Sequence, residues 1–379
     1  MAYRIPFNRV SVVGSELAYV SQALEQGHIS GDGPFSQRCE ELLRQVLGAP
    51  RVLLTTSCTH ALELSALLLE IEAGDEVIVP SFTFPATATA FSLRGARVVF
   101  CDVHPTTLNL DERILESIIS ERTKAVVPVH YAGVGCEMDR ILGIAERAGL
   151  AVVEDNAHGL FGRYRGKPLG TFGVLATQSF HETKNCTCGE GGALVVNDER
   201  LASRGEVLRE KGTNRKAFFR GEVDKYTWVD EGSSYVISDL LAAFLAAQLE
   251  ARDAIQAARK RLWHTYSDSL GDWAASLGAR LPYVPDHCEQ PYHMFYVLLP
   301  SLEYRTALIE HLRTLSILAV FHYLPLHLSP MGQRHGGVRG QCPVTEDVAD
   351  RLLRLPFYVG LGPNEQDEVI DAILEFEYH

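Results

Sequence analysis

One lysine, Lys184, stands where its amine could do covalent chemistry. It follows an apolar run that ends at Phe180, and the glycine-rich segment 189–192 comes soon after it. A lysine forms a Schiff base only as the neutral amine, so packed neighbours must hold it in a partly dry pocket that lowers its pKa. Taken alone, this position is weak evidence for a Schiff-base lysine, because most lysines near a glycine-rich turn are simply solvated. The rest of the chain must decide between the two interpretations.

Polar and aromatic residues also follow other predicted strands, where ligands of open α/β sheets bind. In segment 55–61 a strand gives way to a helix, whose free N–H groups and dipole attract phosphate. Ser57 and Thr59 could bind that phosphate or act as ordinary helix caps. Phe82 and Phe84 follow the next strand, and either could cover a flat ring or pack in the core.

Two adjacent carboxylates, Glu154 and Asp155, end another buried run. A buried anion needs a charged or hydrogen-bonding partner, because an unpaired one is costly. A protonated pyridine nitrogen would serve Asp155, and that pairing keeps the ring an electron sink. A phosphate site, a ring cover, an acid for the ring nitrogen and an amine for an aldehyde are the contacts that pyridoxal phosphate requires. The residues therefore predict this cofactor.

These residues require a scaffold that brings strand ends together. Short apolar runs, typical of buried strands, alternate with stretches of helical spacing. The predicted strands span 51–55, 76–80, 97–101, 124–130, 151–155, 176–180 and 193–197. The predicted helices between them span 60–70, 85–93, 111–119 and 139–148. This alternation predicts an α/β fold with a mostly parallel sheet covered by helices on both faces.

The carboxyl-terminal part has a different pattern. An Ala- and Leu-rich stretch, 239–261, predicts one long helix capped by Ser238 or Asp239. Beyond it we predict strands at 294–299 and 319–323 and helices at 305–314, 345–353 and 363–375. We therefore expect a large cofactor-binding domain with an N-terminal arm over residues 1–250 and a smaller α+β domain over 251–379.

Composition limits the class of protein. The 379 residues carry a net charge of −13, which argues against a general binder of nucleic acid or anionic membranes. The first residues lack the apolar core of a signal peptide, and no run approaches the ~18–20 apolar residues of a membrane span. We expect a cytoplasmic protein. The eight cysteines lack paired spacing, which favours free, mostly buried thiols and no metal site, including at Cys186 and Cys188.

Five segments resemble motifs of the DegT/DnrJ/EryC1/StrS family of sugar aminotransferases, which has the aspartate-aminotransferase (type I) fold. The resemblance covers essentially the whole chain, and its motifs lie at 57–61, 80–87, 154–158, 179–185 and 190–192.

The resemblance implies a role for each matching residue. Lys184 would form the Schiff base with pyridoxal phosphate and shuttle the proton, Asp155 would pair with the pyridine nitrogen, and Phe84 would stack on the ring. His158 falls where many relatives carry glutamine or histidine near the ring oxygen. The phosphate would be bound by Thr59, the backbone at Cys58, and Ser179.

Two comparisons within the family refine this expectation. One branch replaces the lysine with histidine and dehydrates sugars, so Lys184 favours amination, while His181 more simply supports the loop. Many relatives also have a G-x-N-x-R run whose asparagine reaches the partner subunit's phosphate. Here Ser234 and Val236 take the places of that asparagine and arginine, which puts this contact between subunits in doubt.

Segment 208–228 interleaves basic residues with aromatics, which suits a nucleotide diphosphate but also suits a solvated loop. Segments 180–185, 209–215, 218–228 and 322–327 resemble family members that aminate C4 of a dTDP-linked keto sugar. The resemblance implies glutamate as donor and a homodimer with a shared active site. His322 and His327 could equally be structural. The substrate residues so implied are Arg209, Lys211, Asn214, Arg215, Tyr226, His322, Tyr323 and His327.

Three rival functions share parts of this pattern. The enzyme could aminate C3 or C4 of another nucleotide-linked keto sugar, such as a UDP sugar. The chain could instead be a cofactor-bound regulatory protein without turnover. A nicotinamide-dependent dehydrogenase has the same alternation of elements, but no G-x-G-x-x-G follows the early strands.

Overall fold

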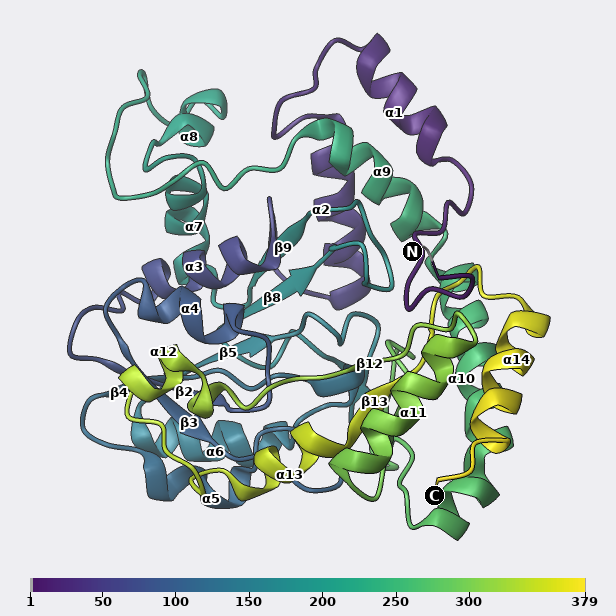
Figure 1. Cartoon of the computed structure of the whole chain (residues 1–379). Coiled ribbons are helices and arrows are strands. Elements are labelled where there is room, and N and C mark those ends of the chain that lie inside the picture. The colour runs from purple at the N-terminus through teal and green to yellow at the C-terminus, as the bar shows by residue number, and fades with distance from the viewer. Residues whose placement is uncertain (1–2, 379) are drawn as a thin grey trace.

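A computed structural model describes residues 3–378 of the chain (Figure 1). Its centre is a seven-stranded sheet in the order β1-β9-β8-β5-β4-β2-β3. The strands are β1 (Arg51–Thr55), β2 (Glu76–Pro80), β3 (Arg97–Cys101), β4 (Thr123–Val126), β5 (Ala151–Asp155), β8 (Leu175–Ser179) and β9 (Gly192–Val196). All neighbours pair in parallel except around β9, which runs antiparallel to both β1 and β8. The predicted mostly parallel sheet is confirmed.

Helices cover both faces of this sheet because successive strand residues point to opposite sides. On one face, Val77 and Val79 of β2 pack in a cluster with α3 (Cys58–Leu68), α4 (Ala86–Ser92) and α7 (Ala202–Arg209). On the other face, Ile78 packs with α5 (Glu112–Ile118) and α6 (Met138–Ala148). The same face beneath β1, β9 and β8 is covered by α1 (Glu16–Glu25), α2 (Pro34–Leu47) and α9 (Asp239–Glu250). The α/β fold class is therefore confirmed.

A separate cluster of buried residues, away from the seven-stranded sheet, is built from chain positions 262–373 together with Ile5. It packs β11 (Tyr296–Leu298), β13 (Leu352–Arg354) and β12 (Val320–Phe321) against three helices. Those helices are α10 (Arg252–Leu277), α11 (Leu302–Thr314) and α14 (Pro363–Leu374). The division into two domains at residue 250 stays a prediction.

Two predicted helices are wrong in ways that packing explains. The predicted helix 239–261 is two helices, because Ala251 leaves helical geometry at φ −84° and ψ 6°. This lets α9 pack against α2 while α10 packs against α14. The predicted helix 345–353 ends at Arg351 (α13, Pro343–Arg351), and the next residues form β13 between β11 and β12. Pairing with two distant strands overrides the local helical pattern.

Several elements have no hydrophobic pattern in the sequence that predicts them. They are the two N-terminal helices, the small sheet of β6 (Arg163–Tyr164), β7 (Lys167–Pro168) and β10 (Cys288–Glu289), and the short helices η1 (Tyr131–Gly133), η2 (Glu199–Leu201), α8 (Arg215–Phe219), η3 (Leu326–Leu328) and α12 (Pro330–Arg334). The predicted strand 124–130 is a strand only over β4. Over residues 3–378, no helix is long and apolar enough to cross a membrane. All eight cysteines are free, and seven of them are buried.

Candidate active site

Lys184 lies in the turn that follows β8. Its N–H donates to His181 O at 2.9 Å, which closes the turn on itself, and Phe180 N donates to Gly191 O at 2.8 Å, which ties the start of the turn to the residue before β9. The next residue, Asn185, anchors the turn to the segment before β11 by donating from Nδ2 to Pro291 O at 2.6 Å. The lysine is thus fixed by neighbours on both sides rather than carried on a free loop.

Burial lowers the pKa of Lys184 from its ordinary value to about 8. The Cys58 thiol and the Asp155 carboxylate oppose that shift, while the charge of Arg354 adds to it. The neutral fraction of this amine near neutral pH is therefore far larger than that of a solvated lysine, and the neutral amine is the form that attacks a carbonyl.

This pKa gives a pH test of the lysine. We expect apo protein to capture added pyridoxal phosphate at a rate that rises about tenfold per pH unit up to pH about 8 and then levels off. The sign follows because only the deprotonated amine is nucleophilic, and its fraction grows until the pKa is passed. Stopped-flow absorbance of the bound cofactor would measure the rates. A rise that continues unchanged to about pH 10, as for a solvated lysine, would contradict the lowered pKa.

Asp155 ends β5 and is 5% exposed. Its Oδ2 accepts from Thr87 Oγ1 at 2.7 Å, and Oδ1 accepts from Ala157 N at 3.2 Å. Thr83 Oγ1 lies 2.9 Å from Thr87 Oγ1 and continues this network. Between residues 3 and 378, no cationic side chain lies within ion-pair distance of this carboxylate. A buried anion held only by a hydroxyl and one amide has capacity for a cationic partner.

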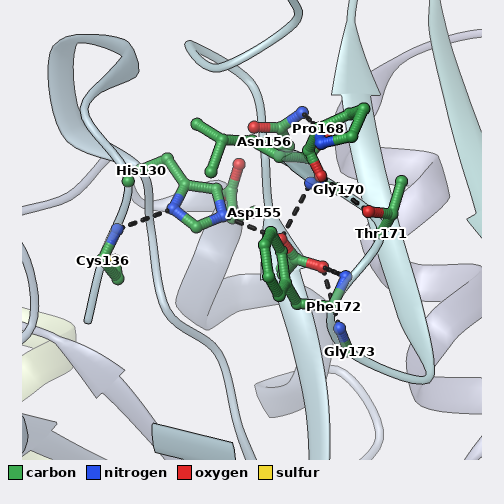
Figure 2. Close-up of polar contacts among 12 residues, drawn as sticks. His130, Cys136, Asp155, Asn156, Pro168, Gly170, Thr171, Phe172 and Gly173 are labelled. Atoms are coloured by element: carbon green, nitrogen blue, oxygen red, sulfur yellow. Dashed lines mark hydrogen bonds and ion pairs between the residues drawn. The ribbon is translucent and has the colours of Figure 1, made fainter. Parts of the chain in front are cut away.

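The neighbouring carboxylate, Glu154, has a different role because successive strand residues point to opposite sides of the sheet. The residues that bind its carboxylate, His130, Gly170, Phe172 and Gly173, are labelled in Figure 2. Glu154 is fully buried, and its Oε2 lies 2.9 Å from His130 Nε2. Its oxygens also accept from three backbone N–H groups, those of Gly170 at 2.8 Å, Phe172 at 2.6 Å and Gly173 at 2.8 Å. Glu154 therefore ties the loop before β8 to β5, and it faces no ligand.

Glu154→Gln should destabilise the fold without touching the reacting groups. The amide of the new glutamine would place its own N–H donors against backbone N–H donors. We therefore expect the free energy of unfolding, measured in urea, to fall by about 3–5 kcal/mol. A matched control is Glu116→Gln, whose ion pair with Arg147 has both side chains 64% exposed, and which should cost about 0–1 kcal/mol. Equal effects of the two substitutions would show that the buried network contributes nothing specific.

The start of α3 presents backbone N–H groups of the kind that bind a phosphate. Ser57 Oγ accepts from His60 N at 3.1 Å, so this hydroxyl acts as the helix cap. The N–H groups of Cys58 and Thr59 have no partner inside the helix, as in any first helical turn. Gly192 lies directly beneath, and a Cβ there would come within 2.3 Å of Ser57 C and 2.4 Å of Cys58 N. Ser179 ends β8, the strand beside β9.

The two phenylalanines that follow β2 lie in different environments. Phe82 is 1% exposed and packs 5.2 Å from the Tyr131 ring, so it belongs to the core. Phe84 is 59% exposed, and its ring centroid lies 6.3 Å from that of Tyr323. Of the two, only Phe84 has a free face to cover a ring.

Three buried histidines stack beside this site. The ring of His158 lies 4.2 Å from His293 at an interplanar angle of 18°, and 6.1 Å from His322 at 25°. Burial holds the pKa of all three well below the ordinary value, which keeps them neutral. His322 Nδ1 lies 2.9 Å from Tyr131 Oη, whereas His158 Nδ1 is buried without a partner in the described chain. No sequence signal singled out His293, which Asn185 Oδ1 contacts at 2.9 Å.

Two predicted substrate residues are structural. Arg209 is 0% exposed, and its guanidinium pairs with Asp32 and, at 2.7 Å, with Glu40. His327 is also fully buried, with Nδ1 2.6 Å from Ser81 Oγ and Nε2 3.0 Å from Glu346 Oε1. Neither has surface left for a substrate. These assignments are corrected: segments distant in the sequence pair with both residues.

The remaining basic and aromatic residues lie on a projection that carries α8 (Figure 1). Tyr226 is 55% exposed, and Arg215 lies over the Phe219 ring at 5.2 Å. Lys211 has its side chain 58% exposed, and Asn214 Oδ1 accepts from Thr227 N at 2.8 Å. The structure thus places these four on one segment and leaves them outside the Lys184 site. Tyr323 and His322 lie with the histidine stack.

These residues fit pyridoxal phosphate: a partly neutral lysine, an unpaired buried carboxylate, an orphaned His158 nitrogen and a helix N-terminus under which only glycine fits. Over residues 3–378, no cluster of three metal-ligating side chains occurs.

Comparison with known proteins gives the same assignment. The model of the DegT/DnrJ/EryC1/StrS aminotransferase family matches residues 11–374. The spore coat polysaccharide biosynthesis protein SpsC of Bacillus subtilis is 32% identical over 377 residues, which are 97% of this chain and 96% of SpsC. Spr1654 from Streptococcus pneumoniae, in its PLP-form, superposes with a TM-score of 0.89 at 27% identity, covering 97% of each chain. S. venezuelae DesV superposes with a TM-score of 0.85 at 33% identity, over 95% of this chain and 94% of DesV.

Matches of this extent, with a lysine and an acid at the expected strand ends, make the protein an aminotransferase that uses pyridoxal phosphate. The chain belongs to the DegT/DnrJ/EryC1/StrS family, and it is a sugar aminotransferase.

Proposed function

We propose that the protein moves the amino group of glutamate to C4 of dTDP-4-keto-6-deoxyglucose. The product would be dTDP-4-amino-4,6-dideoxygalactose, a precursor of bacterial surface polysaccharide such as lipopolysaccharide. The observation that supports amino transfer is the amine of Lys184, with its pKa lowered to about 8 next to a buried carboxylate. The name of SpsC, a polysaccharide biosynthesis protein, supports a role in glycan synthesis.

When bound, the cofactor supplies an electron sink for the bonds broken at the reacting carbon. Lys184 would hold the cofactor aldehyde in the resting enzyme and would be freed when the donor amine displaces it. The freed neutral amine would take the Cα proton of the donor and pass it to the cofactor. In the acceptor half-reaction it would carry a proton from the cofactor to C4 of the sugar. Asp155 would keep the ring nitrogen protonated, and Phe84 would cover one face of the ring. His158 would contact the ring oxygen. Cys58 N–H, Thr59 and Ser179 would bind the phosphate.

The nucleotide of the acceptor would bind to the projecting segment that carries α8. Arg215 and Lys211 are exposed cations on an otherwise acidic protein, and Tyr226 presents a free aromatic face. Such groups suit diphosphate oxygens and a base, with Asn214 beside them. His322 and Tyr323 would line the sugar pocket. We further propose a homodimer in which this segment serves the partner's site, with Ser234 near the position of the missing asparagine.

A panel experiment tests the proposal. The purified holoenzyme is incubated with glutamate and 4-keto and 3-keto sugars linked to dTDP or UDP, and each product is assigned by NMR. We expect amination at C4 of the dTDP sugar, with the galactose configuration. If the enzyme aminated only 3-keto sugars, the reacting carbon would be C3 and not C4. If it aminated only UDP sugars, the proposed nucleotide would be wrong. A protein that binds the cofactor but converts no sugar would be regulatory rather than catalytic.

A further inference from the structure

His293 lies in a short, strained segment of the chain beside the active-site turn. The residue before it, Tyr292, has φ 52°, in the left-handed region that a tyrosine rarely adopts. Side chains from two other parts of the chain bind three successive carbonyls of this segment. Asn185 Nδ2 donates to Pro291 O at 2.6 Å, and Arg259 donates to Tyr292 O at 2.9 Å and to His293 O. Strained backbone persists only where its surroundings fix it, and it is common at functional sites.

The contact between His293 and Asn185 determines which nitrogen of the imidazole carries the proton. Both hydrogens of Asn185 Nδ2 are used, one by Pro291 O and the other by Gln256 Oε1 at 3.1 Å. The oxygen of the amide therefore faces His293, and the histidine Nδ1 must be the donor across the 2.9 Å contact. Burial holds the pKa of His293 well below its ordinary value, so the ring is neutral and its Nε2 carries no proton.

The face of the same imidazole packs on His158. The two ring centroids are 4.2 Å apart at an interplanar angle of 18°, which is a parallel stack. The other rings beside His158, those of Tyr131 and His322, lie farther away at 6.0 and 6.1 Å. No hydrogen bond holds the Nδ1 atom of His158, which is buried without a partner. The stack on His293 is therefore the tightest ring contact that sets the plane of His158.

We propose that His293 is a positioning residue that couples the Lys184 turn to His158. Its Nδ1–H holds Asn185, the residue after the lysine, and its ring face sets the plane of His158. The inference rests on the proposed role of His158 at the ring oxygen of the cofactor, and it extends that role to a residue that acts through its neighbours. Burial is the main cause of the lowered pKa of both histidines, and the charge of Lys184 contributes to each, so the three groups share one site.

Packing alone does not explain a histidine at position 293. A phenylalanine could fill the same space and would bring no polar nitrogen into a buried place. An asparagine could donate to Asn185 in the same way but would offer no ring to stack on His158. Histidine makes both contacts at once, through Nδ1 and through the face of its ring.

The two contacts can be removed separately. His293→Asn keeps a donor in the place of Nδ1 but has no ring, whereas His293→Phe keeps a ring but has no donor. Two quantities are measured: the pH titration of the absorbance of bound pyridoxal phosphate, and the stopped-flow rate at which apoprotein captures added cofactor.

We expect His293→Asn to raise the midpoint of the titration by about one pH unit and to leave the capture rate unchanged. A donor at the ring oxygen favours the deprotonated form of the bound cofactor, in which that oxygen carries the most negative charge, so a misplaced His158 raises the midpoint. We expect His293→Phe to slow capture about 10-fold at an unchanged midpoint, because Asn185 loses the donor that helps to fix the lysine turn.

A double variant shows whether the shift in midpoint passes through His158. His158→Phe should itself raise the midpoint, and adding His293→Asn should raise it no further, because there is then no donor left to position. His327→Asn is the matched control, since His327 is also fully buried, with Nδ1 2.6 Å from Ser81 Oγ. It should change neither the midpoint nor the capture rate.

Additive shifts in the double variant, or an unchanged midpoint in His293→Asn, would overturn the inference. Equal effects of His293→Asn and His293→Phe on both quantities would also overturn it, because a general loss of packing does not distinguish the ring from the donor. If one variant does not fold, the other still tests its own contact. Neither measurement needs a sugar, so if wild-type protein aminates no keto sugar while the shifts occur, the proposed function fails and the role of His293 stands.

Discussion

Lys184→Ala should remove amino transfer altogether within the limits of a steady-state assay. Loss of proton transfer alone accounts for about 10²- to 10⁴-fold in rate, and the variant also loses the covalent attachment of the cofactor. The expected measurements are a missing Schiff-base absorbance and no glutamate-dependent product. Added methylamine should restore a small part of the activity, because a free amine in the vacated space can carry the proton.

Two controls make this result specific. Lys184→Arg keeps a positive charge at this position but supplies no nucleophile, so it should be as inactive as the alanine variant. Lys211→Ala removes an exposed lysine of the projecting segment and should leave the absorbance intact. An unchanged cofactor spectrum in Lys184→Ala would mean that another residue forms the Schiff base.

The sheet could be predicted because its signal is local. A strand buried on both faces, such as β2, is apolar at nearly every position, with Glu76 at its start as the exception, and the run is visible without any knowledge of its neighbours. The strand β13 could not be predicted, because Leu352 and Leu353 follow a helical pattern in sequence and become a strand only through pairing with β11 and β12. The break at Ala251 likewise depends on what α9 and α10 pack against.

The same distinction applies to the site. Lys184 and Asp155 follow buried strands, so their meeting is a consequence of parallel pairing. His293 reaches the site from the carboxyl-terminal part of the chain, and no spacing in the sequence relates it to Lys184. The prediction for Arg209 was wrong because a run of basic residues resembles a ligand site in sequence. In the structure, Asp32 and Glu40, which are distant in the chain, pair with the guanidinium of Arg209. Long-range ion pairing leaves no periodic trace in a sequence.

Asp155→Asn should lower kcat about 10²- to 10³-fold, in line with loss of one preorganised electrostatic contact. The amide keeps the size of the side chain and can still accept from Thr87, so the fold should remain. It cannot offset the charge of a protonated ring nitrogen, so the ring withdraws electrons less strongly. The spectrum of the bound cofactor should change while its Schiff base with Lys184 persists.

A cofactor methylated at the ring nitrogen separates this cause from simple misfolding. Its positive charge is permanent, so it should restore much of the activity of Asp155→Asn and add nothing to the wild type. Asp111→Asn provides a matched control, because Asp111 is a buried carboxylate, 6% exposed, that caps α5 and pairs with Arg113. That substitution should cost stability but not kcat. If the methylated cofactor rescued neither rate nor spectrum, Asp155 would act by shaping the pocket and not through its charge.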